Sequence, residues 1–377
     1  MSKKRKRKIR AELRKNHESR TRQHDLTREF RQHGFDQDES VRAERISGKG
    51  ELTRKRTVIG EVSDTEDSGL SVQLEVDESV CQQGRVLRVH GLTSVVESDA
   101  GAEFRCATRR LLKTLSTDLR NVVAAGDRVW FQPEGAGTGV IERVEPRRGI
   151  LCRTSKGRQH VIVANVDQLL IVSSAAEPML KPNLIDRFLV TAEKSCIRPV
   201  LCINKIDLVD AADLQPLVGV YGQMGYQVLL VSAKTGMGTA RLRRLMIHRH
   251  SVIAGQSGVG KSSLLNSVEP NLELRVNAVS ADSQKGRHTT TNAQLIPLAA
   301  GGYVVDTPGI RQFELWDVIA AEVAGFYRDV RPYVSKCRFP DCTHTHEADC
   351  AVKNAVADGK LDVRRYESYC YLFSGDG

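Results

Sequence analysis

The sequence contains no apolar run of 18 or more residues, so it offers no candidate for a transmembrane helix. Its first residues are charged and lack the apolar region of a secretory signal, which argues against export. The nine cysteines are an odd number, and some, such as Cys196 and Cys202, lie in apolar segments. This favours a reducing compartment, with some thiols in a core and others on a metal. We therefore expect a cytoplasmic protein with no membrane partner.

Summed over the chain after the N-terminal segment, acidic residues balance basic ones. The first 56 residues hold 19 Lys and Arg against 9 Asp and Glu, and the other 321 hold 37 of each, so the net charge of +10 is confined to the first segment. We expect residues 1–57 to be a basic, disordered arm and linker that attracts nucleic acid. A solubilising tail or an import-like signal would have the same composition.

Aromatic residues are scarce, at 5%. Between residues 58 and 150 the chain alternates short strand-like segments with glycine turns, around one polar, partly helical segment at 111–119. The strand-like segments are TVIGEV, GRVLRVHG, TSVVES, EFRCAT, AGDRVWFQPEG and GVIERVEPR. They predict a small Greek-key barrel of the OB type, although spacing alone does not exclude another small β domain. Such barrels often bind irregular nucleic acid, but Phe104, Trp130 and Phe131 are too few to indicate base stacking.

Residues 151–316 alternate apolar strands with helical segments, which predicts a parallel α/β sheet with ligands at the carboxyl ends of its strands. The stretch VLCINKIDLV, residues 200–209, ends such a strand in Asn204, Lys205, Ile206 and Asp207. The Asp207 carboxylate can accept hydrogen bonds from the ring N–H and amino group of guanine, which adenine does not present. This N-K-x-D therefore predicts GTP binding, provided that it is not an accident.

The first 200 residues lack the phosphate loop that a guanine site needs, and the loop occurs downstream instead. Residues 255–262 read GQSGVGKS, which fits G-x-x-x-x-G-K-[ST] between a strand and a helix. Its backbone N–H groups would face the phosphates, Lys261 would reach the β- and γ-phosphates, and Ser262 would bind Mg²⁺. A glycine-rich turn without a ligand is the alternative. The predicted nucleotide-binding residues of the loop are Gly255, Gln256, Ser257, Gly258, Val259, Gly260, Lys261, Ser262 and Ser263.

Three further motifs belong with these. In SAKTG, Ser232 and Ala233 would face the guanine carbonyl, and Lys234 would lie along the ring. In DTPG, Asp306 would hold Mg²⁺ through water, and the Gly309 N–H would sense the γ-phosphate. A protein that uses ATP has no need of N-K-x-D and SAK together.

A switch threonine is expected in GRHTTTN, residues 286–292, between the phosphate loop and DTPG. Thr289 or Thr290 would bind Mg²⁺ there, and we assign Thr289.

The order of these motifs is unusual. A guanine-nucleotide domain normally begins with the phosphate loop and ends with SAK, whereas here N-K-x-D and SAK come first. The motifs keep their usual cyclic order, but the domain begins and ends at a different point in that order, which is a circular permutation. Because the new cut follows DTPG, we hypothesise that the γ-phosphate state is passed to the C-terminal domain through residues 309–335.

Residues 317–377 predict a mostly helical domain with a metal site. Cys337, Cys342, His344 and Cys350 give C-x₄-C-x-H-x₅-C, three thiolates and an imidazole that suit one tetrahedral, structural Zn²⁺. His346 is a rival ligand, and free thiols in a small helical tail are the alternative. The tail DVRRYESYCYLF has helical spacing, and its Arg364, Arg365 and aromatic residues could contact RNA or simply pack.

With these motifs the chain resembles the circularly permuted, ribosome small-subunit-dependent GTPases of the RsgA/YjeQ type over about residues 58–372. The resemblance rests on GDRV, the permuted motif order, GQSGVGKSSLLN, KGRHTTT, DTPG, CAVKNAV and RYESY. It implies an N-terminal OB-type barrel, a central P-loop GTPase domain and a C-terminal zinc domain. It also implies a GTPase that uses Mg²⁺ with GTP, contacts 16S rRNA of the 30S subunit late in its maturation, and leaves after hydrolysis. We expect a monomer.

One departure concerns hydrolysis. Ile310 is apolar at the position where many GTPases carry the glutamine that orients the attacking water. The resemblance implicates His288 instead, beside Lys261 and Thr289 as catalytic residues, although His288 could be an ordinary switch residue. Slow intrinsic hydrolysis that RNA accelerates is therefore expected. The alternatives are an RNA-binding assembly module with GTP as a structural ligand, and a permuted GTPase that acts on the large subunit.

Overall fold

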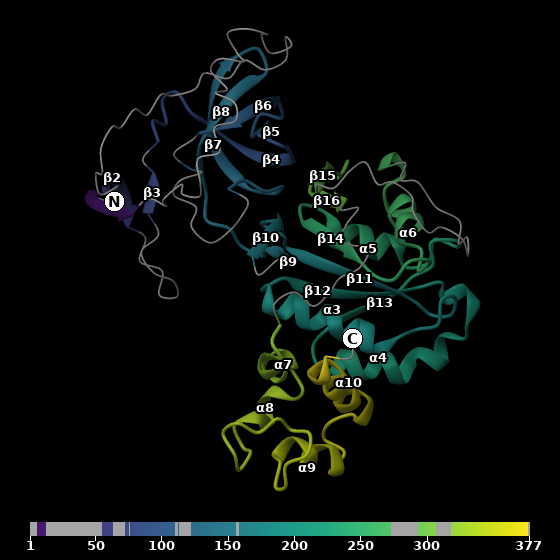
Figure 1. The fold of residues 1–377 in the computed structure, drawn as a ribbon. Helices are drawn as coiled ribbons and strands as arrows, with labels where there is room; N and C mark the ends of the chain where they lie inside the picture. The colour runs from purple at the N-terminus through teal and green to yellow at the C-terminus, as the bar shows by residue number, and fades with distance from the viewer. Residues whose placement is uncertain are drawn as a thin grey trace, which may run out of the picture. The chain divides into compact units, whose positions relative to one another are not determined.

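The computed structural model describes residues 6–12, 55–62, 72–74, 76–109, 112, 122–155, 158–272, 293–306 and 318–375. They fall into two compact units (Figure 1). The first unit comprises residues 1–86, 90–123 and 128–145, and the second comprises residues 87–89, 124–127 and 146–377. Most of the predicted helical segment 111–119 lies outside the described residues.

A five-stranded barrel forms the core of the first unit. Its strands are β4 (Gln82–His90), β5 (Thr93–Ser98), β6 (Glu103–Thr108), β7 (Arg128–Gly135) and β8 (Thr138–Val144). They are ordered β4-β5-β6-β8-β7, and β7 pairs back to β4, which closes the barrel. The β6–β8 pairing is parallel and the β5–β6 and β7–β8 pairings are antiparallel. This closed five-stranded arrangement confirms the predicted OB-type barrel.

Two of the barrel's aromatic residues pack inside the unit. Phe131 is fully buried, and its ring centroid lies 5.0 Å from that of Phe104. The guanidinium of Arg143 lies 5.5 Å from the ring centroid of Trp130. Phe131 is therefore a core residue and offers no platform for a base.

The segment TVIGEV belongs to a separate sheet. β2 (Lys55–Val62) pairs antiparallel with β1 (Lys6–Glu12) and with β3 (Val72–Leu74) in a three-stranded sheet. The segment that was predicted as the first barrel strand therefore precedes the barrel strands in the sequence but is not part of their sheet. One strand of this sheet comes from the segment that was expected to be an arm.

The second unit contains the predicted α/β sheet. Its six strands are β11 (Gln168–Ser174), β12 (Arg198–Asn204), β13 (Gln227–Leu230), β14 (His250–Ala254), β15 (Gln294–Pro297) and β16 (Tyr303–Asp306). They are ordered β13-β12-β11-β14-β16-β15, and all pairings are parallel except β15–β16. β11 and β12 are almost entirely buried, as their continuous apolar sequences require. A hairpin of β9 (Leu151–Ser155) and β10 (Arg158–Val163) precedes the sheet.

Helices follow the strands in alternation. They are α3 (Pro182–Lys194), the 3₁₀ helices η1 (Ile206–Leu208) and η2 (Ala211–Leu214), α4 (Gln215–Gln223), α5 (Thr239–Met246), α6 (Lys261–Val268) and η3 (Pro270–Leu272). Leu242, Met246, Leu264 and Leu265 of α5 and α6 pack with Val200 and other strand residues into one core cluster.

The C-terminal part of this unit is helical, as predicted. It consists of α7 (Ala320–Phe326), α8 (Arg331–Val334), α9 (Ala351–Ala357) and α10 (Val363–Ser374). Tyr327, Val330, Val352 and Tyr369 lie in its own core cluster, which also includes Val190 of α3. The α3 helix thus packs against the C-terminal helices.

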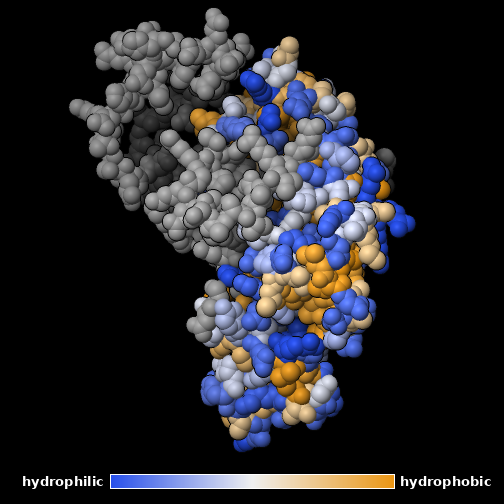
Figure 2. Space-filling view, turned by 90° about the vertical axis from the view of Figure 1, so that its right-hand side faces the viewer, coloured by the Kyte–Doolittle hydropathy of each residue, from blue (hydrophilic) through white to orange (hydrophobic). Residues whose placement is uncertain are grey.

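Among the described residues, no helix is both long enough and apolar enough to cross a bilayer. All nine cysteines are free of disulfides, and Cys106 and Cys202 are fully buried. On the face shown in Figure 2, hydrophobic side chains gather in a patch bordered by hydrophilic ones.

Candidate functional site

The guanine-reading motifs lie at the carboxyl ends of β12 and β13. Asp207, in η1 just after β12, accepts a 2.6 Å hydrogen bond from the hydroxyl of Ser232. This hydrogen bond holds the pKa of Asp207 below its usual value. The carboxylate is therefore ionised at neutral pH, the form that can accept two hydrogen bonds from guanine. The structure thus brings N-K-x-D and SAK together.

Asn204 connects the guanine-reading motifs to the phosphate loop. Its side chain is buried, its Nδ2 donates to the carbonyl of Val259 at 2.9 Å, and its Oδ1 accepts from the N–H of Ala233 at 3.1 Å. One amide therefore joins three motifs that lie far apart in the sequence. Lys205 has a φ of 62°, and its ammonium group donates a hydrogen bond to the carbonyl of Glu177.

The phosphate loop runs from β14 to the first turn of α6. Gly255 has a φ of 147°, and a Cβ there would lie 2.1 Å from the carbonyl oxygen of Val172 in β11. Gly260 has a φ of 86°, and its Cβ would lie 2.6 Å from Nδ2 of Asn204. Only glycine avoids both the strain and the clash. The loop is thus pressed against β11 and Asn204, which fixes its position at the sheet edge.

Lys261 is the first residue of α6 and reaches back over the loop. Its ammonium donates to the carbonyls of Gly255 at 2.8 Å and Gln256 at 2.7 Å. This places a positive charge beside a helix N-terminus whose free N–H groups favour anions. Ser262 and Ser263 follow in the first turn of α6, half-buried. The loop therefore has the donors that a phosphate chain requires.

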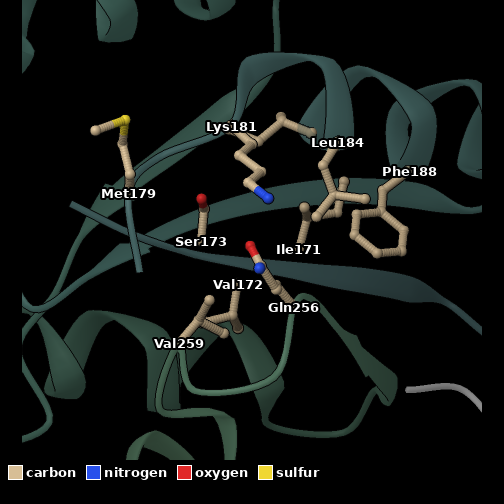
Figure 3. A pocket seen from close by; sticks show the side chains of 10 residues that line it. Ile171, Val172, Ser173, Met179, Lys181, Leu184, Phe188, Gln256 and Val259 are labelled. Carbon is tan, nitrogen blue, oxygen red and sulfur yellow. The ribbon is translucent and has the colours of Figure 1, made fainter. Parts of the chain in front are cut away.

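A pocket lies next to the loop, between β11 and α3 (Figure 3). Gln256 and Val259 of the loop line it together with Ser173, Met179 and Lys181. In Figure 3 the Lys181 side chain points into the pocket, toward Ser173 and Gln256. Neither Lys181 nor this pocket was predicted from the sequence, because no motif marks the N-terminus of α3.

Several predicted site residues cannot be placed. His288, Thr289, Thr290 and Gly309 lie outside the described residues, as does Ile310. Asp306 is the last residue of β16, and only its backbone is described. β16 pairs in parallel with β14, the strand before the phosphate loop, so Asp306 ends a strand at the same sheet edge as Gly255. The roles of all these residues stay predictions.

The four predicted metal ligands converge. One ligand atom from each of Cys337, Cys342, His344 and Cys350 lies within 4.8 Å of every other. The Sγ atoms of Cys337 and Cys350 are 3.9 Å apart, and they lie 3.4 and 3.5 Å from His344 Nδ1. Neighbouring sulfurs in a tetrahedral site with Zn–S bonds of about 2.3 Å lie about 3.8 Å apart, so the four residues fit Zn²⁺. His346, with a side chain 81% exposed, is not among them.

The ionisation of this cluster also suits a cation. Burial lowers the pKa of His344, which keeps its imidazole neutral and able to coordinate. Burial also raises the pKa of Cys342 to about 12, with the hydrogen-bonded thiols of Cys350 and Cys337 adding to the effect. Three thiolates side by side would repel one another, so a bound cation is what allows them to ionise.

The residues around the cluster hold its loop in place. The hydroxyls of Tyr366 and Tyr369 on α10 donate to the carbonyls of His344 and Thr343 at 2.8 and 2.7 Å. Glu347 accepts from the N–H groups of Thr343 and Thr345. The aromatic residues of the C-terminal helix therefore position the ligand loop, a role that its helical spacing alone did not reveal.

A buried ion cluster joins α3 to the C-terminal helices. Arg365 is 3% exposed and pairs with Asp186 of α3 and, at 2.9 and 3.1 Å, with both carboxylate oxygens of Asp329. The hydroxyl of Tyr221 donates to Asp186 at 2.8 Å. Of the two roles expected for Arg365, the structure supports packing. Arg364 is exposed and pairs with Asp362 at the N-terminus of α10.

Comparison with known proteins agrees with this geometry. The family model described as RsgA GTPase matches residues 144–316. The "Small ribosomal subunit biogenesis GTPase RsgA" of Chlorobaculum parvum is 40% identical over 301 residues, which cover 77% of this chain and 96% of the relative. The protein of the same name from Pseudomonas fluorescens is 43% identical over 298 residues, covering 76% and 84%.

Two solved structures are also similar. The crystal structure of YjeQ from Thermotoga maritima has a TM-score of 0.66 and 37% identity, covering 78% of this chain and 98% of that one. The structure of YloQ, titled a circularly permuted GTPase, has a TM-score of 0.63 and 30% identity, covering 80% and 97%. The permuted motif order, the OB-type barrel and the Cys₃His cluster all agree with this kinship. The chain therefore belongs to the RsgA GTPase family and is a circularly permuted GTPase that hydrolyses GTP with Mg²⁺.

Proposed function

We propose that this GTPase binds the 30S ribosomal subunit and couples GTP hydrolysis to a late step of small-subunit maturation and to its own release. The convergence of the guanine-reading motifs and the phosphate loop through Asn204 is the observation that supports the GTPase part of the proposal, since it joins base recognition to phosphate binding. The names of the relatives point to the small ribosomal subunit as the partner. The proposed setting is the cytoplasm, with the protein acting as a monomer on 16S rRNA.

Each site residue has a proposed role. Asp207 and the SAK backbone read guanine, and Lys234 lies along the ring. Lys261 leaves the carbonyls that it now contacts and neutralises the β- and γ-phosphates. The residues proposed to hold Mg²⁺ are Ser262, Thr289 and Asp306, and the N–H of Gly309 senses the γ-phosphate. The remaining nucleotide contacts are proposed to come from Asn204, Lys205, Ser232, Ala233, Gly255, Gln256, Ser257, Gly258, Val259, Gly260 and Ser263.

We assign the positioning of the attacking water to His288, because Ile310 cannot do it. The same proposal assigns each part of the chain to a domain. Residues 58–150 form the OB-type domain, 151–316 the GTPase domain and 317–377 the zinc domain. The barrel and the zinc domain supply RNA contacts, and residues 1–57 add a basic arm.

Co-sedimentation with purified subunits tests the partner. We expect the protein to pellet with 30S, and not with 50S, in the presence of a non-hydrolysable GTP analogue, and to be released when GTP is hydrolysed. The His288→Ala variant should bind the analogue normally and remain on 30S with GTP. Equal binding to 50S would overturn the assignment of the small subunit. Retention of wild-type protein after hydrolysis would instead favour an assembly module with GTP as a structural ligand.

A further inference from the structure

One stretch of the GTPase domain contains no acidic residue. From Leu214 to Val268 the chain has no Asp or Glu, but it has six Lys and Arg and two His. This stretch includes α4, β13, α5, β14, the phosphate loop and α6. Two of its cations, Lys234 and Lys261, belong to the nucleotide motifs. The other four are Arg241, Arg243, Arg244 and Arg249.

Three of these arginines are exposed on α5. Leu242 and Met246 turn inward and are fully buried, whereas Arg241, Arg243 and Arg244 are exposed. Arg241 and Arg244 follow helical spacing, which places them along one side of α5, and the exposed His248 lies two residues beyond Met246, the last residue of the helix. α5 packs against α6, which has no carboxylate of its own. We call Arg241, Arg243, Arg244 and His248 the α5 face.

Among the residues that the structure describes, no acidic side chain pairs with the α5 face. Within the described part of the chain, none of its three arginines forms an ion pair or a side-chain hydrogen bond. Two other exposed arginines of the same unit do: Arg338 pairs with Asp349 at 3.0 Å, and Arg364 with Asp362 at 2.8 Å. The α5 guanidinium groups therefore keep all their donors for a ligand.

The stability of α5 accounts for only two of its three arginines. Cations stabilise the last turn of a helix, which explains Arg243 and Arg244. Arg241 lies in the first turn of α5, where the helix dipole disfavours a cation and where no acidic residue compensates. A positive charge at this position costs helix stability, so its presence needs a reason outside the helix.

We propose that the α5 face binds the phosphate backbone of a structured RNA. Arginine presents planar, forked donors that match phosphate oxygens, and all three cations of the face are arginines. Cations that bind phosphates release the counterions condensed on the RNA, so arginines that no carboxylate neutralises gain affinity. This deepens the proposed function, because it names a surface through which the GTPase domain itself would contact RNA.

The test compares two variants with equal loss of charge in the full-length, GDP-bound protein. R241Q/R244Q removes two cations from the α5 face, and R148Q/R198Q removes two exposed cations elsewhere in the same unit. Glutamine is a good helix former, so α5 should persist. Affinity for a plain RNA duplex and for purified 16S rRNA is measured from 0.05 to about 0.3 M salt, a range in which phosphate contacts dominate affinity. Thermal melting and GDP affinity check that each variant is folded.

We expect R241Q/R244Q to bind RNA roughly 30-fold more weakly at 0.1 M salt and to lower the slope of log affinity against log salt by about 1.5, as two lost phosphate contacts should. R148Q/R198Q should match the wild type. Equal losses in both variants, or no loss in either, would overturn the proposal. So would normal RNA affinity combined with lost 30S binding, because the face would then contact a ribosomal protein.

The two proposals fail separately. If wild-type protein does not bind 30S, the proposed function fails, yet the RNA comparison still decides the α5 face. If wild-type protein binds 30S and the α5 variant binds RNA as tightly as its control, the proposed function stands and the α5 face is refuted.

Discussion

Asp186 of α3 and Arg365 of α10 form a buried ion pair that joins the GTPase fold to the zinc-cluster helices. Burial raises the pKa of Asp186, and the charge of Arg365 opposes that rise. α3 also lines the pocket beside the phosphate loop through Leu184, Ile185 and Phe188. A single helix therefore extends from the phosphate loop to the C-terminal helices.

Removing one partner of this pair should destabilise the fold strongly. Arg365→Met leaves the buried Asp186 and the half-buried Asp329 without this cation, which should cost about 3 to 5 kcal/mol in the free energy of unfolding. The double variant Asp186→Leu, Arg365→Met should recover part of that loss. Chemical denaturation measures both, and Arg364→Met, which removes an exposed neighbour, should change stability little. A small loss for Arg365→Met would show that the ion pair does not hold the two parts together.

Asp207→Asn should change which base is bound. The amide cannot accept both guanine donors, but it can donate to the carbonyl that xanthine carries in place of the amino group. We expect GTP affinity to fall at least about 100-fold, since a site built to hydrogen-bond a particular group discriminates by at least that order when the hydrogen bonds are lost, and xanthosine triphosphate affinity to rise. Competition with a fluorescent nucleotide measures both, with Asp213→Asn, an exposed change in η2, as the control. Unchanged GTP preference would mean that N-K-x-D does not read the base here.

The Cys₃His cluster should bind one Zn²⁺ per chain. Cys350→Ser should remove the metal and lower the melting temperature, because the cation is what permits three close thiolates. Metal content by elemental analysis and thermal melting measure the effect. Cys196→Ser, at an exposed cysteine outside the cluster, should keep full zinc. Full zinc in the Cys350→Ser variant would remove this residue from the ligand set.

Buried thiols should resist alkylation at pH 8. Burial raises the pKa of Cys106 and of Cys202 to about 12, so almost none of either thiol is ionised, and the thiolate is the reactive form. Iodoacetamide followed by mass spectrometry should label the exposed Cys196 in the folded protein, and Cys106 and Cys202 only after denaturation. Rapid labelling of Cys202 in the folded state would indicate that the central sheet opens.

The sequence predicted the parts of the site that consist of short motifs of neighbouring residues. N-K-x-D, SAK and the phosphate loop each follow a strand, so parallel pairing brings them to one edge, and the permutation follows from their order. The metal ligands could also be predicted, because they lie within 14 consecutive residues, from Cys337 to Cys350.

What the sequence did not reveal depends on contacts between distant segments. Nothing near Asp186 in the chain indicates that Arg365 will neutralise it, and an arginine on an amphipathic helix is usually exposed. β2 carries a strand pattern, but the pattern does not specify that its partners are β1 and β3. The hypothesis that the γ-phosphate state passes through residues 309–335 stays a prediction, because residues 307–317 lie outside the described part of the chain.

Steady-state GTP hydrolysis by the purified protein, alone and with isolated 30S or 50S subunits, tests the central claim most directly. The account predicts slow hydrolysis alone, a many-fold rise with 30S only, and no activity in a Lys261→Ala control. A rate that no subunit raises, or that 50S raises equally, would contradict it.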